Sequence, residues 1–265
     1  MSTMPKRIIG FLSDFGTRDY YVAAVKAVIY GMCPDAEVVD ISHEVTPWSI
    51  QEACYVLSCC YEDFPPGTVF LAVVDPGVGT SRKPIIVQTE KYFFVGPDNG
   101  LLTCVAPKPY RAWEITRVPG ERKKFSYTFH GRDVFAPVAA FLACGGRVEE
   151  VAREYGSPVE KGFLELRIED GRIHAEVLHV DRFGNVALNI SEKHLEELGR
   201  PRELVLKIGG VELAVQFGKT FGNVQPGELV AYIDSCGYLE IAVNQGDASR
   251  RLGVRPGSRL EIVFK

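Results

Sequence analysis

The sequence predicts an α/β protein: a mainly parallel α/β sandwich as the N-terminal domain, followed by an all-β, barrel-like C-terminal domain. Before residue 145, short apolar runs alternate with segments of helical period, which is typical of strands and crossover helices around a parallel sheet. From residue 164 onward, short strand-like runs are divided by glycine-bearing turns, which is typical of a small barrel or sandwich. We therefore expect domains at residues 1–160 and 163–265.

The N-terminal domain opens with a predicted strand at 7–12, a polar loop and an amphipathic helix at 20–30. Thr46 is a candidate N-cap, and Pro47 suits the first position of a helix that runs to residue 61. Further strands are expected at 37–41, 69–74, 85–88, 92–95 and 111–116, and a last helix at 130–143.

In the C-terminal domain, Asp170 and Gly171 form a dipeptide that favours a tight hairpin turn. The strands are expected at 164–168, 172–180, 186–189, 204–208, 211–215, 229–233, 238–243 and 259–264. Loops between such strands are common places for binding residues.

Composition and charge argue against several classes of protein. The 265 residues are 46% hydrophobic and 24% charged, which is ordinary for a globular protein. A net charge of -4 gives no basic footprint for nucleic acid. No apolar run reaches the roughly 18 residues that span a bilayer, and the N-terminus lacks the apolar core of a secretory signal. We expect a cytoplasmic protein with neither a membrane nor a nucleic-acid partner.

The seven cysteines are an odd number and contain no CxxC pair. Most have apolar or helical neighbours. This pattern favours buried thiols in a reducing compartment over disulfides or a zinc site.

Asp75 is the first candidate for chemistry, because it follows the apolar strand 69–74 at the carboxyl end, where open α/β sheets bind ligands. Gly77 and Gly79 permit a tight backbone, and Arg82 can fold back toward the carboxylate with its rigid fork of donors. An ion-paired turn that only closes the strand is the alternative.

Asp14, His130 and Asp133 also follow strands or begin helices. Asp14 either caps the helix at 20–30 or accepts the hydroxyl groups of a ribose. His130 precedes a glycine at a helix start, and a base, a ligand and a core histidine are all open interpretations.

Three segments of the C-terminal domain combine aromatic or small polar residues with glycine. They are the turn 181–185 and the loops around Phe221 and residues 232–237. An aromatic face there could stack on a purine, although each segment is also an ordinary structural turn.

Together, these segments resemble the S-adenosyl-L-methionine hydroxide adenosyltransferases, also called S-adenosylmethionine hydrolases, which are related to the fluorinase and chlorinase enzymes. The matching segments run in order along nearly the whole chain: SDFGTRDYYVAAVKAVI, DISHEVTPW, VDPGVGTSR, PDNG, FHGRDVFAP, DRFGNV and the turn that contains Ser235.

The resemblance implies a homotrimer in which the ligand lies between the N-terminal domain of one subunit and the C-terminal domain of a neighbour. It implies attack of water or hydroxide on C5′ of the ribose, giving adenosine and L-methionine. S-adenosyl-L-methionine is then the substrate, and neither a cofactor nor a metal is implied.

The resemblance also assigns site residues. It places a catalytic triad at Asp75, Arg82 and His130, and a ribose-binding carboxylate at Asp14. The other implied substrate-binding residues are Trp48, Phe129, Gly131, Asp181, Phe183, Asn185, Phe221, Ser235 and Cys236. In the mechanism we expect, Asp75 and His130 accept hydrogen bonds from the attacking water and Arg82 fixes Asp75.

Departures from the halogenating relatives at Asp75 and Val78 favour hydrolysis. Those relatives carry hydroxyl-bearing residues where this chain has Asp75 and Val78, and a carboxylate repels a halide. Cys236 stands where they have arginine. The alternatives are a 5′-halogenase-like enzyme, a nucleoside or S-adenosylmethionine binding protein without catalysis, and a phosphoester hydrolase with a metal held by Asp14, Asp75, His130 and Asp133.

Overall fold

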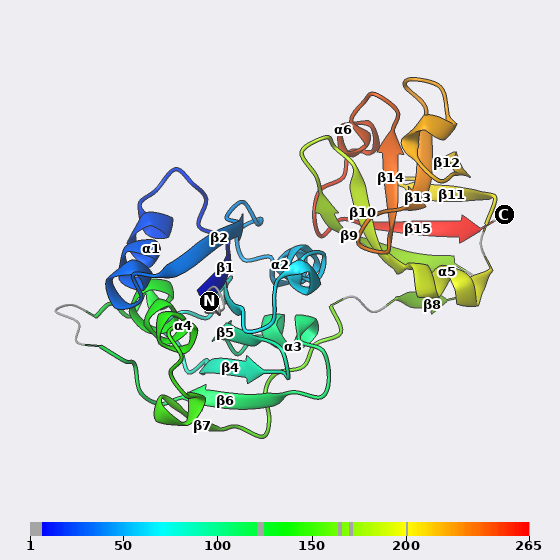
Figure 1. The fold of residues 1–265 in the computed structure, drawn as a ribbon. Coiled ribbons are helices and arrows are strands. Elements are labelled where there is room, and N and C mark those ends of the chain that lie inside the picture. Colours follow the sequence, from blue (N-terminus) through cyan, green and yellow to red (C-terminus); the bar gives the residue numbers. More distant parts are fainter. Residues whose placement is uncertain (1–6, 121–124, 164–165, 170–171, 200, 265) are drawn as a thin grey trace, which may run out of the picture. The chain divides into compact units, whose positions relative to one another are not determined.

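The computed structural model describes residues 7–120, 125–163, 166–169, 172–199 and 201–264. The chain forms two compact units, Met1–Phe163 and Leu164–Lys265, which we call the α/β unit and the barrel unit (Figure 1). Within the described ranges, no helix has the length and apolarity needed to cross a membrane.

A single sheet of seven strands organises the α/β unit, in the order β2-β1-β3-β5-β4-β6-β7. Neighbours from β2 to β5 pair in parallel, whereas β4, β6 and β7 add antiparallel pairs. The strands are β1 Arg7–Ser13, β2 Ala36–Ser42, β3 Val69–Val73, β4 Pro84–Gln88, β5 Phe93–Pro97, β6 Arg111–Ile115 and β7 Ala152–Glu154. The parallel strands bring the loops that follow β1, β2 and β3 to one edge of the sheet.

Helices cover both faces of this sheet (Figure 1). The longer ones are α1 Tyr21–Met32, α2 Ile50–Ser58 and α4 Ala136–Ala143, and the shorter ones are α3 Leu101–Val105, η1 Tyr61–Asp63, η3 Val148–Glu150 and the π-helical turn Gly131–Phe135. Side chains of α1 and α4 form one buried cluster with Ile9, Leu71 and Ile86 of the sheet. This core holds the strand ends rigidly.

Helix α2 begins later than the sequence predicts, so the prediction of an N-cap at Thr46 and a first helical residue at Pro47 is wrong. The N-cap is Ser49, whose hydroxyl accepts the backbone N–H of Glu52 at 3.3 Å. The reason lies in Trp48, which has a left-handed backbone (φ 67°) that no right-handed helix can contain.

The barrel unit is a sheet that closes on itself, which confirms the predicted fold class. Its order is β10-β14-β13-β12-β11-β15-β9, and a β9–β10 pairing closes the ring, while β8 Arg167–Glu169 extends β9 outside it. The strands are β9 Arg172–Val180, β10 Val186–Ser191, β11 Glu203–Ile208, β12 Val211–Phe217, β13 Leu229–Ile233, β14 Tyr238–Val243 and β15 Arg259–Phe264. Short helices α5 Glu192–Leu198, η4 Phe221–Asn223 and α6 Ala248–Leu252 occupy connections. Asp170 and Gly171, the predicted hairpin turn, lie outside the described residues.

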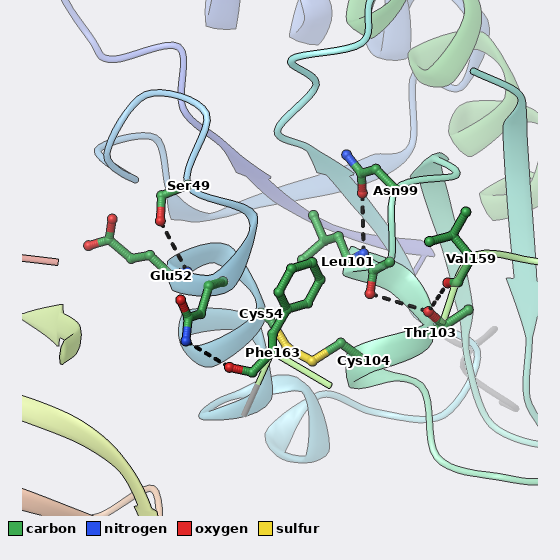
Figure 2. Close-up of a disulfide and its surroundings, with 11 residues drawn as sticks. Ser49, Glu52, Cys54, Asn99, Leu101, Thr103, Cys104, Val159 and Phe163 are labelled. Carbon is green, nitrogen blue, oxygen red and sulfur yellow. Dashed lines mark hydrogen bonds between the residues drawn. A yellow bond between two sulfur atoms is a disulfide. The ribbon is translucent and has the colours of Figure 1, made fainter. Parts of the chain in front are cut away.

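The prediction of buried free thiols is wrong, because Cys60 is the one free cysteine among the residues that the structure describes. A disulfide joins Cys33 at the end of α1 to Cys144 at the end of α4, with Cα atoms 5.9 Å apart. A second disulfide joins Cys54 of α2 to Cys104 of α3, with Cα atoms 6.2 Å apart (Figure 2). Apolar neighbours surround a buried thiol and a buried disulfide alike, so the sequence pattern did not separate them.

Further contacts fix α3 beside the second disulfide. Thr103 donates its hydroxyl to the Val159 carbonyl at 2.6 Å, and the Asn99 side chain accepts the Leu101 N–H at 3.2 Å (Figure 2). Asn99 also donates to the Val74 carbonyl at 2.8 Å, next to Asp75. The disulfide region therefore supports the end of β3.

We expect the Cys33–Cys144 bond to stabilise the α/β unit, because it closes a loop of 111 residues. Replacing both cysteines with serine should lower the free energy of unfolding by about 2–5 kcal/mol, measured by denaturant titration. Cys60→Ser is the matched control, because Cys60 is a free thiol whose pKa is raised to about 11 by burial and by Asp63. Alkylation of Cys33 and Cys144 in unreduced, folded protein would contradict the assignment.

Candidate active site

A cavity of about 410 Å³ opens at the edge of the α/β unit where β1, β2 and β3 end. It is lined by Asp14, Phe15, Tyr21, Pro47, Trp48, Val73, Asp75, Val78, Thr128, Phe129, His130 and Gly131. Six of the predicted site residues are therefore brought together here, from segments far apart in the sequence: Asp14, Trp48, Asp75, Phe129, His130 and Gly131.

Arg82 holds both other members of the predicted triad. Its Nε donates to Asp75 Oδ1 at 3.1 Å, its Nη2 donates to Asp75 Oδ2, and Nη2 also lies 3.1 Å from His130 Nδ1. The side chains of Arg82 and Asp75 are only 8% and 6% exposed. Asp75, Arg82 and His130 thus form one hydrogen-bonded group, in which the carboxylate and the guanidinium are largely buried.

The chemistry of this group fixes the tautomer of His130. A guanidinium has donors and no acceptor, so Nδ1 must accept and the ring hydrogen must sit on Nε2. Burial lowers the pKa of His130 below its ordinary value, and the nearby charge of Arg82 lowers it further. The ring is therefore neutral at pH 7.

Two local features make this arrangement of Arg82 possible. Gly79 has a left-handed backbone (φ 77°), and a Cβ there would lie 3.0 Å from the Tyr127 carbonyl oxygen. The Phe135 ring lies 5.3 Å from Arg82 Cζ, close enough for a cation–π contact. Among the described residues, Arg82 Nη1 is buried without a hydrogen-bond partner, which indicates a place for a further polar atom.

Asp14 enters the same cavity from the loop after β1. Its Oδ2 accepts the backbone N–H of Trp48 at 2.9 Å. Burial raises the pKa of Asp14, and repulsion from the Asp75 carboxylate raises it further. The cavity thus holds two carboxylates of different surroundings, one paired with arginine and one bound by a backbone amide.

Aromatic side chains form the remaining wall. The Phe129 ring makes edge-to-face contacts with Phe15 and Tyr21, at centroid distances of 6.0 and 5.2 Å. A Cβ on Gly131 would lie 3.0 Å from the Phe15 ring, so glycine lets the π-helical turn approach this wall. The Trp48 side chain is 71% exposed. Sequence reasoning missed Phe15, Tyr21, Pro47 and Thr128 as cavity residues, although all four lie in or beside the segments it singled out.

A second cavity, of about 490 Å³, lies in the barrel unit. It brings together the predicted residues Phe183, Asn185 and Phe221 with three residues that sequence reasoning missed, Val243, Gln245 and Gly246. The Phe183 and Phe221 side chains are 76% and 55% exposed. The three missed residues carried no sequence signal, because they follow an ordinary strand.

Asp181, Ser235 and Cys236 do not line this second cavity. Asp181 accepts hydrogen bonds from the backbone of Phe183 and Asn185 and from the Asn185 side chain, at 2.8 to 2.9 Å. The Cys236 N–H donates to Asp234 Oδ1 at 2.8 Å, which orders the loop that carries Ser235. These contacts shape the loops beside the cavity.

Asp133, which the metal-hydrolase alternative needs as a ligand, is engaged elsewhere. It is fully buried, Arg132 donates two hydrogen bonds to its oxygens at 2.7 Å, and the Ser126 N–H donates at 2.8 Å. Among the residues described, no group of three or more His, Cys, Asp or Glu is placed to hold a metal ion. Asp133 is therefore not available as a ligand beside Asp14, Asp75 and His130.

The fold and the site define a class of two-domain proteins that combine an α/β unit, with a cavity at the edge of its sheet, and a closed β-barrel unit. Residues 9–152 match the family model for the SAM hydroxide adenosyltransferase N-terminal domain, and residues 175–261 match the model for its C-terminal domain. The chain belongs to this family, which confirms the resemblance seen in the sequence.

Relatives and solved structures agree with this membership. The chain is 40% identical to an (R)-S-adenosyl-L-methionine hydrolase of Thermus thermophilus, over 97% of this chain and 100% of that protein. It is 28% identical to a fluorinase of an Actinoplanes species, over 96% of this chain and 97% of that protein. An uncharacterized conserved protein of Thermotoga maritima has a similar crystal structure, with a TM-score of 0.88 and 44% identity over 96% of this chain and 99% of that one.

The left-handed backbone of Trp48 leads to a stability prediction. At φ 67°, alanine is strained and glycine is not, so Trp48→Gly should be more stable than Trp48→Ala by about 1 kcal/mol in denaturant unfolding. The control pair is Tyr127→Gly and Tyr127→Ala, at another exposed aromatic whose φ is not positive, where alanine should be the more stable residue. A Trp48→Gly variant less stable than Trp48→Ala would contradict the strain.

Proposed function

We propose that this protein hydrolyses S-adenosyl-L-methionine to adenosine and L-methionine, by attack of water or hydroxide on C5′ of the ribose. The observation that carries the proposal is the hydrogen-bonded group of Asp75, Arg82 and His130 beside a cavity that also contains Asp14. The hydrolase name of the Thermus relative supports the same reaction.

The chemistry of the substrate puts the catalytic demand on the nucleophile. A sulfonium leaves as a neutral thioether, so the leaving group needs neither a proton nor a metal ion. The nucleophile is a single water that must be aligned behind C5′ at about 3–3.5 Å. We propose accordingly that the reaction uses no cofactor and that S-adenosyl-L-methionine is only the substrate.

In the proposed mechanism, Asp75 accepts the proton of this water and His130 Nε2–H donates to its oxygen. Arg82 already donates to His130 Nδ1, so Nε2–H is the group that the neutral ring can offer. This replaces the expectation from the sequence that His130 accepts a hydrogen bond from the water. Each Asp75 oxygen accepts one hydrogen bond from Arg82 and keeps a lone pair for the water. As the C5′–O bond forms and the C5′–S bond breaks, the released proton passes to the Asp75 carboxylate.

The rest of the cavity suits the adenosyl group. We propose that Asp14 accepts the ribose hydroxyls with the carboxylate that the Trp48 amide already orients. Trp48, Phe129 and Gly131 then flank the ribose and the adenine, because aromatic faces can stack on a purine and glycine leaves room for it.

We further propose that the barrel unit of a neighbouring copy completes the site in a homotrimer. Phe183, Asn185 and Phe221 would contact the adenine, since two exposed rings in one cavity are available for stacking. The loops of Asp181, Ser235 and Cys236 would contact the methionine and adenine ends. Because the substrate is an intracellular metabolite, the proposed location is the cytoplasm, a compartment in which disulfides are uncommon.

Hydrolysis is favoured over halogenation by the two residues nearest the proposed nucleophile. Asp75 presents a buried carboxylate that repels a halide ion. Val78 lines the cavity and has no hydroxyl that could hold one.

Replacing Asp75 with asparagine removes the proton acceptor but keeps an oxygen for Arg82. We expect turnover to fall by about 10²-fold or more, while the affinity for adenosine changes far less. Chromatography of released adenosine gives the turnover, and calorimetry gives the affinity. Asp98→Asn is the control, because Asp98 is also a buried carboxylate but binds Val159 and Tyr155. Undiminished turnover in Asp75→Asn would remove Asp75 from the mechanism.

The lowered pKa of His130 sets the expected pH dependence. As the pH falls through this lowered value, Nδ1 gains a proton and faces the donors of Arg82, so the group breaks apart. The acid limb of kcat/KM should therefore lie below pH 6.5, the ordinary value for histidine. His130→Gln should lose this limb. A limb above pH 6.5, or one that persists in His130→Gln, would contradict the assignment.

A further inference from the structure

A chain of hydrogen-bonded side chains ties the loop after β1 to the end of β2. Ser13 Oγ lies 2.7 Å from His43 Nδ1, and His43 Nε2 lies 3.0 Å from Asp40 Oδ1. Lys26 of α1 donates to Asp40 Oδ2 at 2.5 Å. Ser13 is fully buried and His43 is 5% exposed, whereas the Asp40 side chain is 43% exposed, so this chain runs from the interior of the α/β unit to its surface.

The direction of each hydrogen bond follows from the carboxylate at one end. Burial alone would raise the pKa of Asp40, but the hydrogen bonds from Lys26 and His43 outweigh it, so its pKa is lowered and it only accepts. His43 Nε2–H therefore donates to Asp40, and in the neutral ring Nδ1 accepts the Ser13 hydroxyl hydrogen. The Ser13 oxygen is left to accept the Phe15 N–H at 3.4 Å.

The same two segments are also joined by their backbones. The Gly16 N–H donates to the His43 carbonyl at 2.7 Å. Asp14 thus lies between Ser13, held by the imidazole of His43, and Gly16, held by the carbonyl of the same residue. Asp14 and Phe15 of this tied loop both line the cavity, and Asp14 is the residue that brings a carboxylate close to Asp75.

A serine, a histidine and an aspartate in series suggest a nucleophilic triad, but two observations argue against it. The Ser13 hydroxyl is fully buried, so no substrate carbon can reach it. Serine also contacts Nδ1 and aspartate contacts Nε2, which is the reverse of the arrangement in serine hydrolases. The chain of hydrogen bonds therefore positions the loop and carries out no chemistry.

We propose that Asp40, His43 and Ser13 are positioning residues that aim the Asp14 carboxylate at the ribose hydroxyls and so set the preference for a ribonucleoside. This inference rests on the proposed role of Asp14 in the substrate site. A carboxylate that accepts hydrogen bonds from two hydroxyls at once must hold both of its oxygens in a fixed orientation. A loop without these tying hydrogen bonds would not maintain that orientation.

Ser13→Ala tests the inference, with adenosine and 2′,3′-dideoxyadenosine as probes in calorimetry. We expect the variant to bind adenosine about 10-fold more weakly and the dideoxy probe unchanged, since only the ribose hydroxyls contact Asp14. With S-adenosyl-L-methionine, KM should rise while kcat changes little. Thr68→Val is the matched control, because it deletes a buried hydroxyl that donates to the Pro65 carbonyl at the opposite end of β3.

Two further comparisons separate positioning from general stability. Asp40→Asn keeps an acceptor oxygen for His43 and should retain the preference for adenosine, whereas Asp40→Ala should lose it. In an Asp14→Asn background, Ser13→Ala should have no further effect on the ratio of the two affinities. A tenfold loss of affinity for both probes, or an effect of Ser13→Ala that persists in Asp14→Asn, would overturn the proposal.

The outcomes also separate this inference from the proposed function. Wild-type protein that prefers adenosine over the dideoxy probe, but releases no adenosine from S-adenosyl-L-methionine, would reject the hydrolase and retain the positioning role. If the wild-type protein hydrolyses the substrate but Ser13→Ala has unchanged selectivity between the two probes, the hydrolase is retained and the positioning role is rejected. A wild type with no preference between the probes would overturn the positioning role.

Discussion

The buried ion pair of Arg82 and Asp75 is the interaction on which the site depends. Removing two charges from water costs several kcal/mol per ion, and close hydrogen bonds on both sides must offset that cost. Arg82 meets this requirement because its Nε and Nη2 contact the two Asp75 oxygens. Nη2 also contacts His130 Nδ1. The contacts of this one guanidinium therefore fix the hydrogen positions on both partners: the Asp75 carboxylate carries none, and the His130 ring carries one on Nε2. The carboxylate is left as an acceptor and the imidazole as a donor, which is the pair of roles that a single water molecule needs.

Unfavourable local features gather around the same cavity. Trp48 has a strained backbone, Asp14 has a carboxylate whose pKa is raised by burial and by Asp75, and Arg82 Nη1 has no hydrogen-bond partner within the described chain. Such features persist only where the surrounding structure holds them, and they are common at functional sites. Here the support comes from the α1 and α4 core on one face of the sheet, and from α2 and α3, joined by the Cys54–Cys104 bond.

Local patterns predicted much of the fold and part of the site. The apolar run before Asp75 predicted a buried strand with a carboxylate at its end, and the spacing to Arg82 predicted the ion pair, because both depend on neighbours in sequence. The start of α2 was not predictable, since it depends on the left-handed Trp48 and its hydrogen bond to Asp14, 34 residues away. The disulfides were not predictable for the same reason, because Cys33 and Cys144 are 111 residues apart in the sequence. His43 gave no sequence signal of its own, because its role depends on Ser13 from another strand.

The tautomer of His130 is the most direct test of this account, since it follows from Arg82 alone and decides how the triad can hold a water molecule. Nitrogen NMR of the histidine side chains at neutral pH, assigned by comparison with His130→Gln, reports which ring nitrogen carries the hydrogen. The account requires a neutral ring with the hydrogen on Nε2 and a bare Nδ1. A hydrogen on Nδ1, in either the neutral or the charged ring, would contradict it.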